Sequence, residues 1–137
     1  MKINDSDKEL IKIATDIVTK NNDLYEKKGL HVGCALKAKS GKIYIGINIK
    51  TSHSVCAEQV AIGQALANGE REFDTIVTVK ENTDGSTRVI SPCGLCRYIF
   101  DKLNMDMMVL VEDIKNDKIL KVKAEELLPY PYKRNRD

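Results

Sequence analysis

The sequence has no tryptophan, and aromatic residues make up only 5% of its 137 positions. Proteins that bind single-stranded nucleic acid stack successive bases on aromatic side chains, so this scarcity argues against such a surface. No charge of one sign dominates either, because 22 basic residues face 20 acidic ones. The one basic cluster is Lys133, Arg134 and Arg136, at the C-terminal end. There we expect a solvated tail rather than a phosphate contact.

Long apolar runs are also missing, and none approaches the ~20 residues that a membrane-spanning helix needs. The first residues lack the apolar segment of a secretory signal peptide. We therefore expect a cytoplasmic protein with no membrane partner. Disulfides are rare in that compartment, so the four cysteines are expected to be metal ligands, catalytic groups or core residues.

The chain shows no internal repeat, low-complexity segment or linker, so residues 1–137 are predicted to form a single domain. Ser6 and Glu9 have the spacing of a capping box and predict the start of a helix that ends near Asn21. Apolar periodicity and turn residues predict the rest. Strands are expected at residues 31–38, 42–49, 73–80, 105–111 and 119–122, and helices at 56–68, 93–103 and 124–128.

This order of elements predicts an α/β fold, a three-layer α/β/α sandwich around one mixed five-stranded sheet. The first two strands are separated by Ser40-Gly41, a hairpin turn, and should pair antiparallel. The later strands are expected to be parallel, because crossover connections link them.

Two short segments contain the residues that could bind a metal ion and catalyse a reaction. Cys56-Ala57-Glu58 opens one predicted helix, and Pro92-Cys93-Gly94-Leu95-Cys96-Arg97 opens another. A helix N-terminus lowers the pKa of a thiol, because the helix dipole and free N–H groups stabilise the thiolate. Cys93 and Cys96 are three positions apart, so both can face one metal ion from a single helical turn.

Three thiolates, from Cys56, Cys93 and Cys96, leave one position of a tetrahedral zinc ion open for catalysis. Water at that position becomes a nucleophile near neutral pH. We predict that Arg97 hydrogen-bonds the thiolates and offsets their negative charge. Glu58 stands two residues beyond Cys56, close enough to move protons between that water, a ring nitrogen and a leaving amine.

The cysteine motifs also allow other interpretations. A lone C-x-x-C motif is more often a redox or structural zinc motif. A structural site of four thiolates could use Cys34, although Cys34 lies within an alternating apolar run that favours a buried core residue. A structural site would not require the Glu58 carboxylate or the proline before Cys93.

At these residues the chain resembles the cytidine deaminase family, which includes the blasticidin S deaminases. The resemblance covers residues 30–132. It rests on five short motifs: His31-Val32-Gly33-Cys34-Ala35-Leu36, Ser40-Gly41-Lys42-Ile43-Tyr44, Gly46-Ile47-Asn48, Ile90-Ser91-Pro92-Cys93-Gly94-Leu95-Cys96-Arg97 and Glu125-Glu126-Leu127-Leu128-Pro129. The resemblance implies a cytidine deaminase-like fold and hydrolysis of a free cytosine nucleoside to the uracil nucleoside and ammonia.

The resemblance also implies roles for individual residues. Backbone groups near Ala57 and Ser91 would hold the base, and Asn48 would contact the sugar. One zinc ion would be bound per subunit of a homotetramer, with a homodimer as the alternative. Tyr132 would close the pocket of a neighbouring subunit. No nucleic acid polymer is expected as a partner, because a basic groove and stacking aromatics are missing and the first ligand is Cys56 rather than histidine.

The chain departs from the family pattern near the sugar contact. Nucleoside deaminases usually have Asn-x-Glu there, whereas this sequence has Asn48-Ile49-Lys50, and the segment from Asn48 to Cys56 is about three residues shorter. Leu30 stands at a position that is often aromatic. Lys50 is either a solvated lysine or a contact to a substrate anion. Blasticidin S carries a carboxylate on its sugar-like ring, so cytidine, deoxycytidine and blasticidin S are all candidate substrates.

Overall fold

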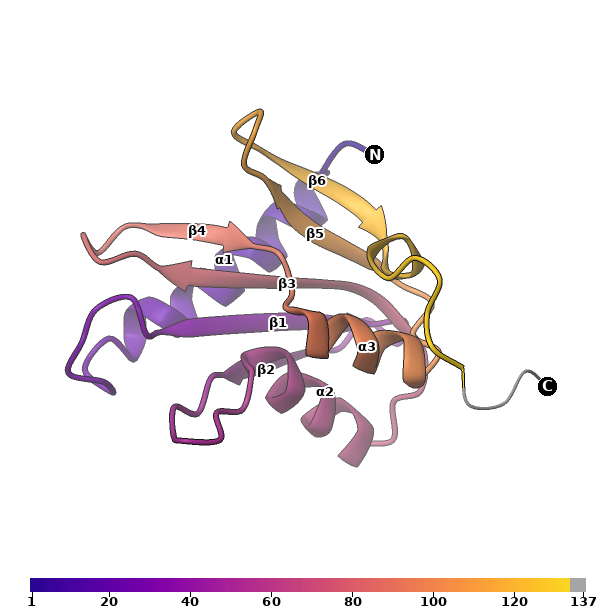
Figure 1. The fold of residues 1–137 in the computed structure, drawn as a ribbon, viewed down its shortest axis with the longest axis horizontal. Coiled ribbons are helices and arrows are strands. Elements are labelled where there is room, and N and C mark those ends of the chain that lie inside the picture. Colours follow the sequence, from indigo (N-terminus) through magenta and orange to yellow (C-terminus); the bar gives the residue numbers. More distant parts are fainter. Residues whose placement is uncertain (134–137) are drawn as a thin grey trace.

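The computed structural model describes residues 1–133. Along the chain, each α-helix is followed by two strands (Figure 1). The elements are α1 (Asp5–Lys20), β1 (Val32–Ala38), β2 (Ile43–Ile47), α2 (Ala57–Ala67), β3 (Phe73–Glu81), β4 (Thr87–Ile90), α3 (Gly94–Lys102), β5 (Met108–Asp113), β6 (Lys118–Lys123) and a short 3-10 helix, η1 (Ala124–Leu127). Within the described residues, the longest helix is too short and too polar to cross a lipid bilayer.

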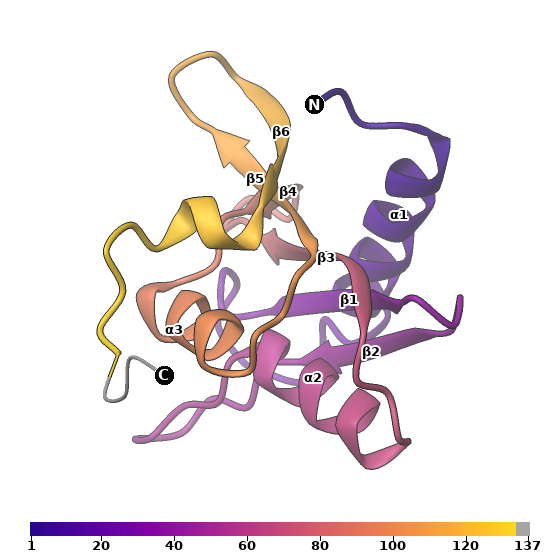
Figure 2. The same cartoon turned by 90° about the vertical axis from the view of Figure 1, so that its right-hand side faces the viewer.

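The strands form one mixed sheet in the order β2-β1-β3-β5-β6, with β4 paired to β3 off this path. Helix α1 covers one face, and α2 and α3 lie together on the other (Figure 2). Each side of the sheet has its own apolar core, centred on Leu10 and Val77 beneath α1 and on Ile76 and Phe100 beneath the other two helices. The predicted three-layer α/β/α sandwich is confirmed.

The predicted number of strands was wrong, because the sheet has six rather than five. The additional strand, β4, is four residues long and pairs antiparallel with the end of β3. A turn closed by a hydrogen bond from the Asn82 N–H to the Ser86 carbonyl joins the two strands. So short a segment, half of it the polar Thr87 and Arg88, shows no apolar periodicity.

The predicted pairing was right for β1 with β2, which are antiparallel, and for β3 with β5, which are parallel. It was wrong for β6, which pairs antiparallel with β5. Only a tight turn, with Asp117 at φ 50°, separates these two strands, and parallel neighbours need a much longer crossover.

Among the element boundaries that differ from the prediction, two have a clear physical reason. Helix α1 begins at Asp5, and the capping box joins Asn4 with Asp7 instead of Ser6 with Glu9. Strand β5 begins at Met108 rather than at residue 105, because the Met105 N–H bonds back to the Phe100 carbonyl at the end of α3.

Candidate active site

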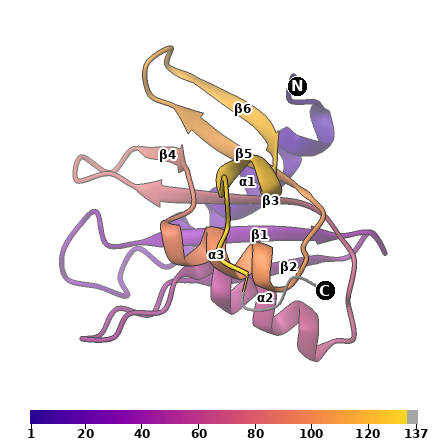
Figure 3. The same ribbon diagram turned by 45° about the vertical axis from the view of Figure 1, so that its right-hand side comes forward.

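The cysteines of both chemical motifs lie at helix starts. Cys56 is the N-cap of α2 and Cys93 the N-cap of α3, and Cys96 lies in the first turn of α3. The two helices lie side by side on one face of the sheet (Figure 3). Gly46 permits the close approach of α2 to β2, since a Cβ there would overlap the carbonyl oxygen of Ala57. The fold thus brings both motifs to one place.

The three thiols form a cluster of the size that zinc requires. The Sγ atoms of Cys56 and Cys93 lie 3.8 Å apart, and the three Sγ atoms all lie within 4.8 Å of one another. A tetrahedral zinc ion with bonds of about 2.3 Å to sulfur holds its ligand atoms about 3.8 Å apart. The donor set therefore fits zinc, with a fourth position left open.

The thiols differ in how readily they ionise. Burial alone would raise the pKa of Cys93, but hydrogen bonds from the Cys96 N–H and the neighbouring thiols lower it below the ordinary value. Burial raises the pKa of Cys56 and, far more strongly, that of Cys96. Backbone N–H groups in the first turn of α3 therefore help to lower the pKa of Cys93, whereas at Cys56 burial is the largest cause and the pKa is raised. Three crowded thiols cannot all ionise without a nearby cation, so the cluster suits a metal ion.

Glu58 lies in the first turn of α2 and is only 4% exposed. Burial raises the pKa of its carboxyl group, and hydrogen bonds from its own N–H, from Thr78 and from Cys96 partly oppose this. A carboxyl group with a raised pKa can both accept and return a proton near neutral pH. Its position beside the thiols is the one that a proton carrier needs.

A hollow of about 210 Å³ opens beside this cluster. It brings together four of the five predicted substrate contacts, Asn48, Lys50, Ala57 and Ser91, with Glu58. Val32, Ser54, Val55 and Ile90 also line it and were not predicted. Val32 and Ile90 stand in two of the quoted motifs, at strand ends, and Ser54 and Val55 belong to the loop before Cys56.

The side chains of Asn48 and Ser91 already form hydrogen bonds with backbone groups of this chain. The Asn48 side chain accepts from the Val32 N–H (2.9 Å) and donates to the Leu30 carbonyl (2.6 Å). The Ser91 hydroxyl accepts from the Glu112 N–H (3.2 Å). Each group keeps further hydrogen-bonding capacity for a ligand.

Tyr132 and Arg97 lie apart from the hollow. Tyr132 is 72% exposed and is absent from the hollow of its own chain. Arg97 donates to the carbonyl oxygens of Pro92 (2.8 Å) and Leu127 (3.4 Å). The hydrogen bonds that the structure gives Arg97 therefore go to backbone carbonyls and not, as predicted, to the thiols. Arg97 fixes the loop that delivers Cys93.

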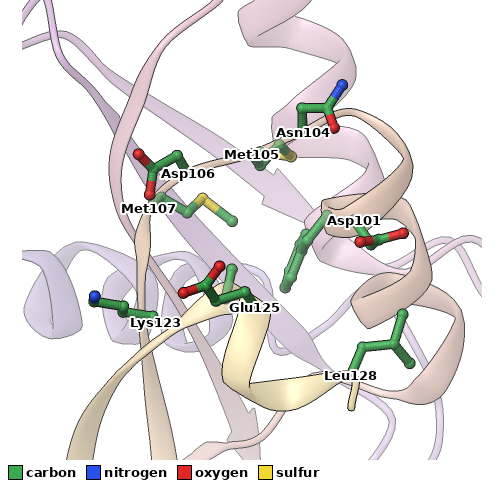
Figure 4. Close-up of a pocket in the computed structure, with 10 residues that line it drawn as sticks. Asp101, Asn104, Met105, Asp106, Met107, Lys123, Glu125 and Leu128 are labelled. Atoms are coloured by element: carbon green, nitrogen blue, oxygen red, sulfur yellow. The ribbon is translucent and has the colours of Figure 1, made fainter. Parts of the chain in front are cut away.

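A larger hollow, of about 480 Å³, lies at the other end of α3 (Figure 4). Asp101, Asp106 and Glu125 surround it, together with Met105 and Met107. None of the cysteines and no part of Glu58 lines it. The groups that can move protons and bind zinc lie at the smaller hollow, which is the candidate active site.

Residues 4–112 match the family described as "Cytidine and deoxycytidylate deaminase zinc-binding region". The chain belongs to this family. It is therefore a zinc-binding deaminase, a hydrolase of C–N bonds, as the sequence predicts. The three clustered thiols are positioned to bind the metal ion of the family.

Individual relatives agree with this assignment. The chain is 41% identical to the blasticidin-S deaminase of Bacillus cereus, over 97% of this chain and 96% of the relative. It is 38% identical to a cytidine deaminase of Sporosarcina psychrophila, over 72% and 71% of the two chains. A crystal structure of cytidine deaminase from Burkholderia pseudomallei superimposes with a TM-score of 0.70 at 27% identity, covering 91% of this chain and 98% of that one.

Proposed function

We propose that this deaminase hydrolyses the exocyclic amino group of a free cytosine nucleoside. Water replaces the amine at the ring carbon, so that cytidine or deoxycytidine and water give uridine or deoxyuridine and ammonia. The observation that carries the proposal is that buried Glu58 lines one small hollow together with Cys56 and Cys93, and that Cys96 completes the thiol cluster beside it.

Each residue then has a defined task. Cys56, Cys93 and Cys96 hold zinc, which when bound makes water nucleophilic at neutral pH. Glu58 takes a proton from the attacking water, passes it to the ring nitrogen and later protonates the leaving amine. Backbone groups at Ala57 and Ser91 hold the base.

A second candidate substrate is blasticidin S. Lys50 lines the hollow beside Asn48, where it can meet the carboxylate on the sugar-like ring of blasticidin S. The 41% identity to a blasticidin-S deaminase over nearly the whole of both chains favours the same substrate. An acidic sugar contact, as in the nucleoside deaminases, would instead repel that carboxylate.

The assembly that we propose is a homotetramer, with a homodimer as the alternative. Ile43, Ile45 and Ile49 on and after the edge strand β2 are 38–49% exposed, which is typical of a surface that a second subunit covers. Exposed Tyr132 would close the hollow of a neighbouring subunit. Light scattering coupled to size-exclusion chromatography measures the mass, and a monomer would refute the proposal.

A cytoplasmic location completes the proposal. All four cysteines are free thiols, the state that a reducing compartment maintains. Cell fractionation tests this placement.

The deciding experiment measures ammonia release from cytidine, deoxycytidine, cytosine and blasticidin S in parallel. Glu58→Gln, which keeps the shape of the side chain, should retain zinc and lose about 10²- to 10⁴-fold in kcat. The ranking of the wild-type rates identifies the substrate. If the zinc-loaded wild type releases no ammonia from any of the four compounds, the proposed substrate class is wrong. If Glu58→Gln keeps full activity, its assigned role is wrong.

A further inference from the structure

A tyrosine outside both chemical motifs holds the backbone at the mouth of the active-site hollow. The Tyr25 hydroxyl donates to the Asn48 carbonyl (2.6 Å) and accepts from the Lys50 N–H (2.9 Å). These two backbone groups flank Ile49, and the side chains of Asn48 and Lys50 line the hollow. One hydroxyl therefore fixes the segment that carries both predicted contacts to the sugar.

This segment has few other restraints. Strand β2 ends at Ile47, and the Asn48 N–H makes the last hydrogen bond to β1, at the Val32 carbonyl. Ile49 pairs only with Val55, across a loop whose residues 50–54 are exposed. Beyond Asn48 the sheet therefore no longer sets the position of Lys50, and Tyr25 supplies the missing anchor.

Tyr25 is itself held in place by contacts with His31. Its backbone N–H donates to Nε2 of His31 (3.3 Å), and the two rings lie 5.4 Å apart at an angle of 41°. His31 is 1% exposed. Gly29, at φ +86°, makes the turn that lets residues 25 and 31 meet. Figure 1 shows the α1–β1 segment and the β2–α2 segment at the same end of the molecule.

A buried carboxylate supports His31 in turn. Because Nε2 accepts a hydrogen bond, the neutral ring carries its proton on Nδ1. Among the described residues Nδ1 has no hydrogen-bond partner, and the Glu81 carboxylate lies 3.6 Å away. The Glu81 N–H also donates to the His31 carbonyl (3.0 Å). This buried pair is far from the thiols in sequence and has no task in the proposed reaction.

We propose that Tyr25 is a positioning residue for substrate recognition: it fixes Asn48 and Lys50 at the hollow, and His31 and Glu81 fix Tyr25. The inference rests on the proposed function, because it assigns the sugar end of the substrate to this side of the hollow. It predicts that loss of the hydroxyl weakens nucleoside binding and leaves the chemical step intact.

The test compares Tyr25→Phe with Tyr44→Phe. Tyr44 is the matched control, because its hydroxyl also makes a hydrogen bond, to Glu70 (2.8 Å), at the far end of β2. Tyr25→Phe should raise KM for the preferred nucleoside about tenfold, with kcat changed by less than about twofold and zinc content unchanged. Tyr44→Phe should leave both constants at wild-type values.

Amide hydrogen exchange provides a readout that does not depend on turnover. The Lys50 N–H should exchange faster in Tyr25→Phe than in the wild type, while the Ile49 N–H, bonded to Val55, stays protected. A purely structural role for Tyr25 would reduce the folded, active fraction, and so lower kcat without raising KM. That pattern, or unchanged exchange at Lys50, would overturn the inference.

A failure of the proposed function gives a different result. In that case the wild type itself releases no ammonia from any cytosine compound. Equilibrium binding of cytidine to the zinc-loaded proteins then replaces KM, with the same tenfold difference expected between wild type and Tyr25→Phe. Equal affinity of the two proteins would overturn the role of Tyr25.

Discussion

The Sγ atoms of Cys56 and Cys93 lie 3.8 Å apart, although 37 positions separate the two residues in the chain. Each is the N-cap of a helix, and the two helices begin at the same place on one face of the sheet. Ionised together without a cation, these thiols would repel each other and the buried Glu58. Metal binding and the approach of the first turns of α2 and α3 therefore stabilise each other.

Removing one thiol should release the metal. Cys96→Ala is expected to lower the zinc content from about one ion per chain to less than about a tenth of that at equal free zinc. Cys34→Ala is the control. Cys34 is fully buried in β1 and lies outside the cluster of three, so this variant should keep its zinc. Elemental analysis of the purified proteins decides, and loss of zinc from Cys34→Ala would revive the four-thiolate structural site.

A methyl group at Gly46 should disturb the start of α2. The new Cβ would overlap the Ala57 carbonyl oxygen and lie 2.7 Å from the Ala61 nitrogen. We expect Gly46→Ala to cost about 1–3 kcal/mol of unfolding free energy and to reduce zinc affinity. Gly63→Ala is the matched control on the exposed side of α2, where the added methyl group meets open space. It should stabilise the protein by about 0.5–1 kcal/mol in denaturant titrations.

The charge at position 50 should set the preference between substrates. Lys50→Glu is expected to raise the ratio of kcat/KM for cytidine to that for blasticidin S by about tenfold, because attraction of the carboxylate becomes repulsion. Lys39→Glu makes the same charge change at the opposite, hairpin end of β1 and should leave the ratio unchanged. Parallel kinetics on the two substrates provide the measurement. An unaltered ratio in Lys50→Glu would mean that Lys50 is only a solvated lysine.

A pH-dependent part of the stability should come from Glu70. Hydrogen bonds from the hydroxyls of Ser40 and Tyr44 lower the pKa of its carboxyl group below the ordinary value of 4.5. Because the folded-state pKa is depressed, the stabilisation is present above pH 4.5 and disappears as the pH falls through the lower folded value. At pH 7 the wild type should have a higher melting temperature than Glu70→Gln, and this difference should disappear toward pH 3. Thermal melts across that range test this, and a difference that stays constant would exclude Glu70 as the cause.

The positions of the proposed zinc ligands and of Glu58 could be predicted because local rules place them. A cysteine before a helix, a second cysteine three residues on and a glutamate in a first turn are patterns of a few adjacent residues, and the structure leaves them where these patterns put them. The prediction failed for features whose structure depends on a contact with a residue distant in sequence. Arg97 turns to the Leu127 carbonyl, 30 positions away, and β4 exists only because the end of β3 pairs with it.

Tyr25 illustrates the same limit. It lies in a polar segment without helical or strand periodicity, and its hydroxyl meets backbone groups 23 and 25 positions further along the chain. Backbone acceptors and donors are the same at every residue, so side-chain patterns do not reveal such a contact. The position of α1 against the sheet and the turn at Gly29 create it.

Because Tyr25 anchors Lys50, substrate preference can be changed separately from the residues assigned to metal binding and proton transfer. The groups proposed to bind metal and move protons lie at the starts of helices on the sheet, whereas the anchor comes from the connecting segment before β1. Loops tolerate exchange far better than packed helices do. Rewriting residues 21–28, of which all but Tyr25 are exposed, is therefore a route to new substrate preferences that leaves the reaction machinery intact.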